Sequence, residues 1–109
     1  MTKITSRLLE DSFEIDVIGH ANYDEYGKDI VCSAVSILTF SLHKYLLDAL
    51  DKGRLTTYRY TFEDGAIRLN CGFKDSTVKE GIKSILGGYE ILAENYEKNA
   101  SYSPKGISL

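Results

Sequence analysis

The fold is decided by a change of hydrophobic period within residues 12–52, SFEIDVIGHANYDEYGKDIVCSAVSILTFSLHKYLLDALDK. Apolar and acidic residues alternate at the start of Ser12–His20, which is the pattern of a half-buried strand. From Ile30 to about Lys52, apolar residues recur at helical spacing instead. Asp29 is a good helix N-cap, and Gly53 stands where a glycine ends a helix. The stretch therefore predicts a strand, a polar loop and a long amphipathic helix.

Strands with similar patterns flank this stretch on both sides. Thr2–Leu9 is expected to pair with Ser12–His20 through a tight turn at Glu10-Asp11. Leu55–Phe62 is expected to pair with Ala66–Phe73 through Asp64-Gly65, a dipeptide that suits a turn with positive φ. The sequence therefore predicts two β-hairpins, one before and one after the long helix.

A second helix is expected from about Val78 to Glu97, preceded by a capping-box spacing between Thr77 and Glu80. Gly87 and Gly88 interrupt this helix, at about 1 kcal/mol each relative to alanine. They either permit a close approach of another backbone or mark a weak position in the helix.

The element order β-β-α-β-β-α predicts an α+β fold, an antiparallel sheet packed against two helices. A chain of 109 residues is one compact domain with a single core, so we expect one domain over 1–109. Residues 99–109 show no matching pattern, and we expect them to form a loosely ordered tail.

Composition restricts the class of function. The chain has 13 basic and 16 acidic residues, a net charge of −3, with no visible basic patch, so direct nucleic-acid binding is not expected. No apolar run approaches the roughly 20 residues of a membrane span. Two cysteines are too few for a disulfide framework or a zinc cage. We therefore expect a soluble cytoplasmic domain with free thiols, no membrane contact and no metal.

The polar loop and the helix start bring together a candidate Cys–His pair. With Asp29 as N-cap, Cys32 occupies the third helical position, where unpaired backbone N–H groups and the helix dipole favour thiolate over thiol. His20 precedes Cys32 by twelve residues, across a loop long enough to bring the imidazole beside the sulfur. Such a pair is the minimum apparatus of a cysteine protease.

The other histidine and the other cysteine are excluded from this pair. His43 follows Cys32 by eleven residues on the same helix, which displaces it by about 16 Å along the axis. Cys71 alternates with the apolar residues of its strand and belongs to a core face.

Each residue of the site also has a purely structural interpretation. A cysteine near a helix start is commonly a small buried hydrophobe, and His20 can be a solvated strand end. Asp29 needs no role beyond the cap, and its carboxylate would oppose a thiolate nearby. Ser36 lies one turn after Cys32, where its hydroxyl can bond either the sulfur or the backbone carbonyl of Cys32.

The same residues resemble the motif of a known family. GHA at Gly19–Ala21, GKDIVC at Gly27–Cys32 and AVS at Ala34–Ser36 resemble the ribosomal-processing cysteine protease family, Prp. The His-to-Cys spacing and the element order are similar as well, so the resemblance covers residues 2 to about 97. Ser33 departs from the alanine that the family motif carries after the cysteine.

The resemblance implies a function and a set of roles. Members are small homodimers that remove the N-terminal extension of a large-subunit ribosomal protein precursor, cutting after a Phe-Phe pair that basic residues soon follow. By match to the motif, Cys32 is the nucleophile and His20 the general base. Asp29 is the motif's acidic residue and Ser36 its serine. No cofactor is implied.

The loop Asn22–Lys28 is expected to contact substrate, chiefly through Asn22, Asp24, Glu25 and Gly27. We expect Asp24 and Glu25 to meet the basic residues beyond the cleavage point. Two other readings stay open at this point: a non-catalytic ribosome-associated binding module, and a phage-encoded protease that acts on capsid or scaffold protein.

Overall fold

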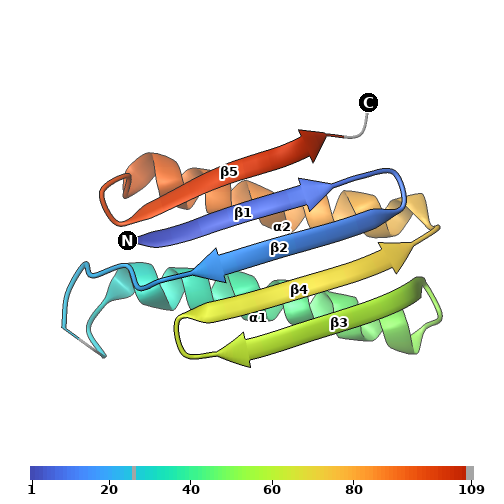
Figure 1. Ribbon diagram of the computed structural model, residues 1–109, viewed down its shortest axis with the longest axis horizontal. Coiled ribbons are helices and arrows are strands. Elements are labelled where there is room, and N and C mark those ends of the chain that lie inside the picture. The colour runs from blue at the N-terminus through green and yellow to red at the C-terminus, as the bar shows by residue number, and fades with distance from the viewer. Residues whose placement is uncertain (26, 108–109) are drawn as a thin grey trace.

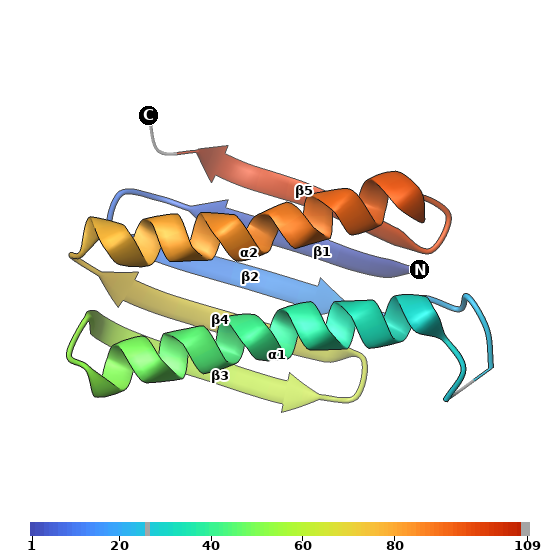
Figure 2. The same ribbon diagram turned by 180° about the vertical axis from the view of Figure 1, so that it is seen from behind.

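The computed structural model describes residues 1–25 and 27–107 and contains five strands and two helices. The elements are β1 (Thr2–Leu8), β2 (Ser12–Ile18), α1 (Ile30–Asp51), β3 (Leu55–Glu63), β4 (Ala66–Phe73), α2 (Ser76–Asn95) and β5 (Ala100–Ile107). One sheet of order β3-β4-β2-β1-β5 carries both helices on a single face, as Figures 1 and 2 show from its two sides. The predicted α+β class is confirmed.

The C-terminal segment differs from the prediction. Residues 100–107 form β5, which pairs in parallel with β1, so they are not a loosely ordered tail and the sheet is mixed rather than antiparallel. The parallel direction follows from α2, which carries the chain back along the sheet, as a crossover helix does (Figure 2). Pro104 is tolerated because β5 is an edge strand. Residues 108–109 lie outside the described part of the chain.

The start of α2 is also corrected. The helix begins at Ser76, with Asp75 as its N-cap, rather than at Val78. The backbone N–H and the hydroxyl of Thr77 both donate to Asp75 Oδ1, at 2.8 and 2.6 Å. A carboxylate is a strong acceptor for these N-terminal donors, so Asp75 caps the helix and the expected capping box of Thr77 and Glu80 is not used.

The core lies between the helix-bearing face of the sheet and the two helices. Phe13, Ile15 and Val17 of β2 are buried, as the alternating pattern predicted. The inward stripe of α1 contributes Val31, Val35, Thr39, Leu42, Leu46 and Ala49. No apolar run near the length of a membrane span was expected from the sequence, and α1 corrects this: by length and composition alone it is apolar enough to cross a membrane, with a mean hydropathy of 1.6. In the fold, 28% of that window is buried.

Two adjacent glycines of α2 have different surroundings, which answers the question that the sequence left open. A Cβ at Gly88 would come within 2.4 Å of Leu38 Cδ2 on α1, whereas nothing lies within 4 Å of a Cβ at Gly87. Gly88 therefore permits the close approach of the two helices, and Gly87 is a weak position in the helix.

Gly87→Ala should raise the free energy of unfolding by up to about 1 kcal/mol, because alanine is the better helix former and meets no neighbour. Gly88→Ala should give a smaller gain or a loss, because Leu38 must change its rotamer to make room. Urea unfolding of the two variants measures the difference. Equal gains at both positions would contradict the assigned role of Gly88.

Candidate active site

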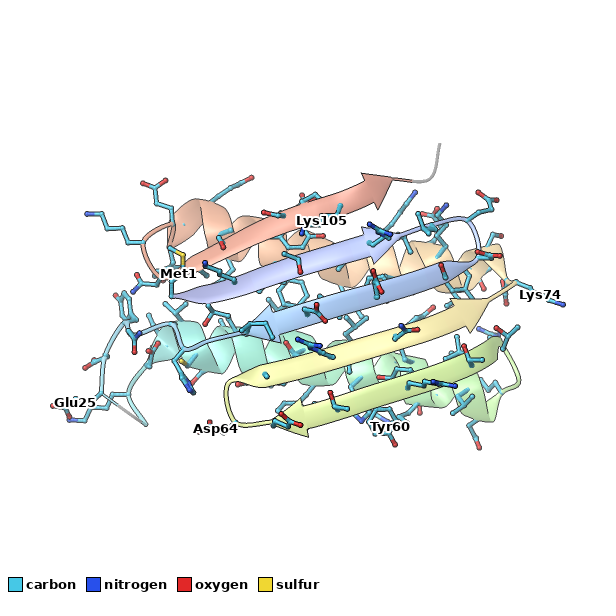
Figure 3. The ribbon with its side chains drawn as sticks, in the orientation of Figure 1. Met1, Glu25, Tyr60, Asp64, Lys74 and Lys105 are labelled. Atoms are coloured by element: carbon cyan, nitrogen blue, oxygen red, sulfur yellow. The ribbon has the colours of Figure 1, made fainter. Side chains whose placement is uncertain are left out.

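A groove of about 860 Å³ opens where the end of β2, the following loop, the start of α1 and the β3–β4 turn meet. The residues that line it include seven of the eight predicted site residues: His20, Asn22, Asp24, Gly27, Asp29, Cys32 and Ser36. The eighth, Glu25, is not among the described lining residues. Figure 3 shows Glu25 at the outer tip of the loop and Asp64 at the β3–β4 turn, both at the same end of the sheet.

Cys32 lies in the first turn of α1, as predicted. Asp29 is the N-cap, with extended backbone angles of −79° and 101°, and its Oδ1 accepts the backbone N–H of Cys32 at 2.9 Å. The cysteine is partly buried and lines the groove. The helix start therefore presents this sulfur to the groove beside the positive end of the helix dipole.

The Asp29 carboxylate also connects the helix to the loop that precedes it. Its Oδ2 accepts the backbone N–H groups of Tyr23, at 2.9 Å, and Asp24, at 3.4 Å. The residue is buried, with 7% of its surface exposed. Burial by itself raises the pKa of Asp29, but the hydrogen bonds from Cys32, Tyr23 and Asp24 outweigh it and hold the pKa below its usual range. The carboxylate is therefore ionised at neutral pH.

His20 follows the end of β2 and lies against the β3–β4 turn. Its Nε2 is 3.7 Å from Asp64 Oδ1, and its side chain is 59% exposed. The preceding residue, Gly19, donates its backbone N–H to the carbonyl oxygen of Gly65 at 2.8 Å. The sequence predicted the Asp64-Gly65 turn as a hairpin connection and missed its contact with the histidine, because these residues are distant in sequence.

His43 and Cys71, which the sequence excluded from the Cys–His pair, have surroundings of their own. The Nδ1 of His43 is hydrogen-bonded to the Tyr58 hydroxyl at 2.7 Å, and burial lowers the pKa of this histidine. Cys71 is 1% exposed, and burial raises the pKa of its thiol to about 12. Neither is among the described residues that line the groove.

Iodoacetamide near neutral pH should therefore alkylate Cys32 and leave Cys71 unmodified. The thiolate is the reactive form, and a buried thiol with a pKa of about 12 is almost entirely protonated at pH 7. Mass spectrometry of the labelled peptides measures the two rates. Labelling of Cys71 in the folded protein at the rate of Cys32 would contradict the assignment, and labelling of both in urea serves as the control.

The groove also has an apolar wall that the sequence did not predict. It is formed by Val17, Val35, Phe40 and Ile67. Phe40 is 53% exposed, and its ring stacks on that of Phe62 with the centroids 5.6 Å apart. The helical and strand periods indicate only which residues share a face of their own element. They do not show which faces border a groove.

The charged residues that line the groove are acidic. Asp24, Asp29, Glu63 and Asp64 are lining residues, and the described lining contains no lysine or arginine. Asp29 accepts three backbone N–H groups. Asp24 accepts the backbone N–H of Glu25 at 2.7 Å, and Asp64 lies 3.7 Å from His20 Nε2. In the described part of the chain, no group of three or more His, Cys, Asp or Glu residues is arranged to hold a metal ion.

Comparisons with known proteins identify the family and related folds. A family model described as cysteine protease Prp matches residues 1–101. The ribosomal processing protease Prp from Staphylococcus aureus, solved with a covalently linked product peptide, is 21% identical with a TM-score of 0.75, over 96% of this chain and 100% of that one. The same protease with a substrate peptide is 20% identical, with the same coverage and a TM-score of 0.60. SMU.848 from Streptococcus mutans is 27% identical with a TM-score of 0.68, over 100% and 96% of the two chains. No curated protein matches the chain.

Proposed function

The chain belongs to the cysteine protease Prp family, and we propose that this cysteine protease removes the N-terminal extension of a large-subunit ribosomal protein by cutting after a Phe-Phe pair. The observation that carries the proposal is the groove in which Cys32 and His20 are both lining residues. The S. aureus relative is a ribosomal processing protease, which supports the class of substrate. Family membership favours the protease over a non-catalytic binding module.

The proposed reaction uses Cys32 as the nucleophile and His20 as the base and acid. The sulfur attacks the carbonyl carbon of the second phenylalanine while His20 takes up the thiol proton. His20 then gives this proton to the departing amine as the peptide C–N bond breaks. Water, deprotonated by His20, hydrolyses the resulting thioester and restores the thiol. No cofactor is required by these steps.

Hydrogen bonds at the start of α1 occupy two of the backbone N–H groups that could bind the oxyanion of the tetrahedral intermediate. The N–H of Cys32 donates to Asp29 Oδ1 at 2.9 Å, and the N–H of Ser33 donates to the Asp29 carbonyl at 3.1 Å. Both groups are therefore already used, and the oxyanion is expected to bind other donors of the groove. Ser36, one turn further along α1, lines the groove and is a candidate polar contact for the substrate.

The wall of Val17, Val35, Phe40 and Ile67 supports specificity for apolar side chains. A test uses the precursor's N-terminal peptide and a variant in which alanines replace the Phe-Phe pair. Mass spectrometry should show one cut after the pair in the first peptide and none in the second. Cutting of both peptides alike would contradict the proposed specificity. A phage-encoded enzyme would instead leave the ribosomal peptide whole and cut a capsid or scaffold peptide.

Asp24 is proposed to meet the basic residues that follow the cleavage point. It lines the groove, whereas Glu25 lies 3.9 Å from Lys28 and points away from the fold (Figure 3). The pair of changes Asp24→Ala and Glu25→Ala should raise KM about two- to fivefold for a peptide that carries lysine. We expect Asp24→Ala alone to account for this increase, with Glu25→Ala as the matched control. An equal rise for a neutral peptide would reject the charge contact.

We also propose that the enzyme is a cytoplasmic homodimer. The outer face of α1 supports association, because Ile30 and Ile37 are 54% and 68% exposed. Exposed apolar side chains clustered on one helix commonly mark an interface. Sedimentation analysis should give twice the monomer mass, and Ile37→Glu should shift it toward the monomer. A monomer mass for the unmodified protein would contradict the homodimer.

A further inference from the structure

We propose that the β3–β4 turn positions His20: Gly65 provides the space in which the imidazole lies, and Asp64 biases the ring proton toward the nitrogen beside it. The proposal rests on the proposed function, in which His20 exchanges a proton with Cys32. It makes Asp64 and Gly65 positioning residues, since neither is required to touch the reacting atoms.

The imidazole of His20 lies on the side of Gly65 where any other residue would carry its side chain. A Cβ at this position would come within 3.2 Å of Nε2 and within 3.8 Å of both Cδ2 and Cε1. The first distance is shorter than an ordinary van der Waals contact, so a Cβ at 65 would require the ring to shift by a few tenths of an ångström. Gly65 also has a φ of +73°, which glycine adopts without strain. The positive φ and the close approach of the ring both favour glycine at this position.

The backbone joins the turn to the segment that carries the histidine. Gly19 donates its N–H to the Gly65 carbonyl at 2.8 Å, which extends the β2–β4 pairing beyond the last register pair, Ile18 and Ala66. This hydrogen bond fixes the backbone before His20 relative to the turn, and the ring lies on the side of Gly65 where a side chain would stand.

Asp64 lies beside one nitrogen of the ring. Its Oδ1 is 3.7 Å from His20 Nε2. In neutral histidine one ring nitrogen carries a proton and the other a lone pair, and a partner of one nitrogen selects the tautomer. A carboxylate beside Nε2 favours the proton there, which leaves the Nδ1 lone pair to accept the Cys32 proton. The Asp64 side chain is 98% exposed, so its effect should be small beside that of Gly65.

The test compares Gly65→Ala with Gly53→Ala. Gly53 is a matched control, because its φ of +71° carries the same backbone strain and nothing lies within 4 Å of a Cβ there. Gly65→Ala should lower kcat about tenfold with KM unchanged, because a small displacement of a catalytic group costs rate and not affinity. The rate of Cys32 alkylation should fall in parallel. Gly53→Ala should leave kcat and the rate of Cys32 alkylation unchanged, while it loses about as much thermal stability as Gly65→Ala.

Equal kcat and equal alkylation rates in the two glycine variants would overturn the role of Gly65. His20→Ala distinguishes this failure from a failure of the proposed function. If His20→Ala retains full cleavage, the proposed base is wrong. If His20→Ala is inactive and Gly65→Ala matches Gly53→Ala, only the positioning proposal fails.

A second pair of variants tests Asp64 without changing the backbone. Asp64→Asn should lower kcat about two- to threefold, in keeping with an exposed charge. Asp64→Glu should recover most of the loss, because it restores the carboxylate near Nε2. A kcat for Asp64→Asn equal to that of the unmodified enzyme would remove Asp64 from the proposal.

Discussion

Cys32→Ala should lower kcat/KM for the precursor peptide by at least about ten-thousandfold, because no other group in the groove can form the thioester. Cys71→Ala is the matched control: it removes the other thiol, buried among core residues, and should cost stability while leaving kcat/KM near its normal value. Chromatography of the cleaved peptide measures both. Loss of cleavage in Cys71→Ala with a folded protein would contradict the assignment of the nucleophile.

His20→Ala should be similarly inactive, because the same ring supplies the proton to the departing amine. His43→Gln is its control, since His43 is bonded to Tyr58 and lies outside the described lining of the groove. The chain has two cysteines and two histidines, and these four variants test whether only Cys32 and His20 are required for cleavage. Residual cleavage by His20→Ala above a few per cent would point to another proton donor.

Asp29→Ala should lower both stability and activity. It removes the acceptor of three backbone N–H groups, from Cys32, Tyr23 and Asp24, and an N-cap loss of this kind costs about 1–2 kcal/mol. The loop and the first turn of α1 lose their common anchor, so Cys32 is no longer held in place. We expect kcat/KM to fall by more than about tenfold.

Asp75→Ala provides the matched control for Asp29→Ala. Asp75 is the N-cap of α2 and accepts the N–H and hydroxyl of Thr77, but it is not among the described residues of the groove. Its removal should lower stability and leave cleavage by the folded enzyme unchanged. Equal loss of activity in the two variants would show that helix capping in general, and not the anchor at Asp29, controls the site.

The stability effect of Asp29 should depend on pH. Because its pKa is lowered in the folded state, the carboxylate stabilises the fold above its ordinary pKa near 3.8, and this contribution is lost as the pH falls through the lower folded-state value. Urea unfolding at pH 7 and at pH 3 should therefore show a larger difference between Asp29→Ala and the unmodified protein at pH 7. A difference that grows toward pH 3 would contradict the assigned direction.

Much of the candidate site could be predicted from the sequence because its contacts are local. Asp29 caps a helix that begins at the next residue, and its bond to Cys32 spans only three positions. The alternation before His20 and the helical period after Ile30 belong to single elements. Such features depend on backbone geometry and short-range hydrogen bonds, so the order of residues in the sequence is enough to predict them.

Other features depend on which segments meet, and the tertiary structure alone decided them. β5 carries little apolar alternation, and it becomes a strand because β1 offers an unpaired edge. The contact of His20 with Asp64 and Gly65 joins the end of β2 to a turn far along the chain. Phe40 lies outside the buried stripe of α1, yet it lines the groove and stacks on Phe62 of β3. Within each element the period determines which face is apolar, whereas the pairing and packing of distant segments determine what that face meets.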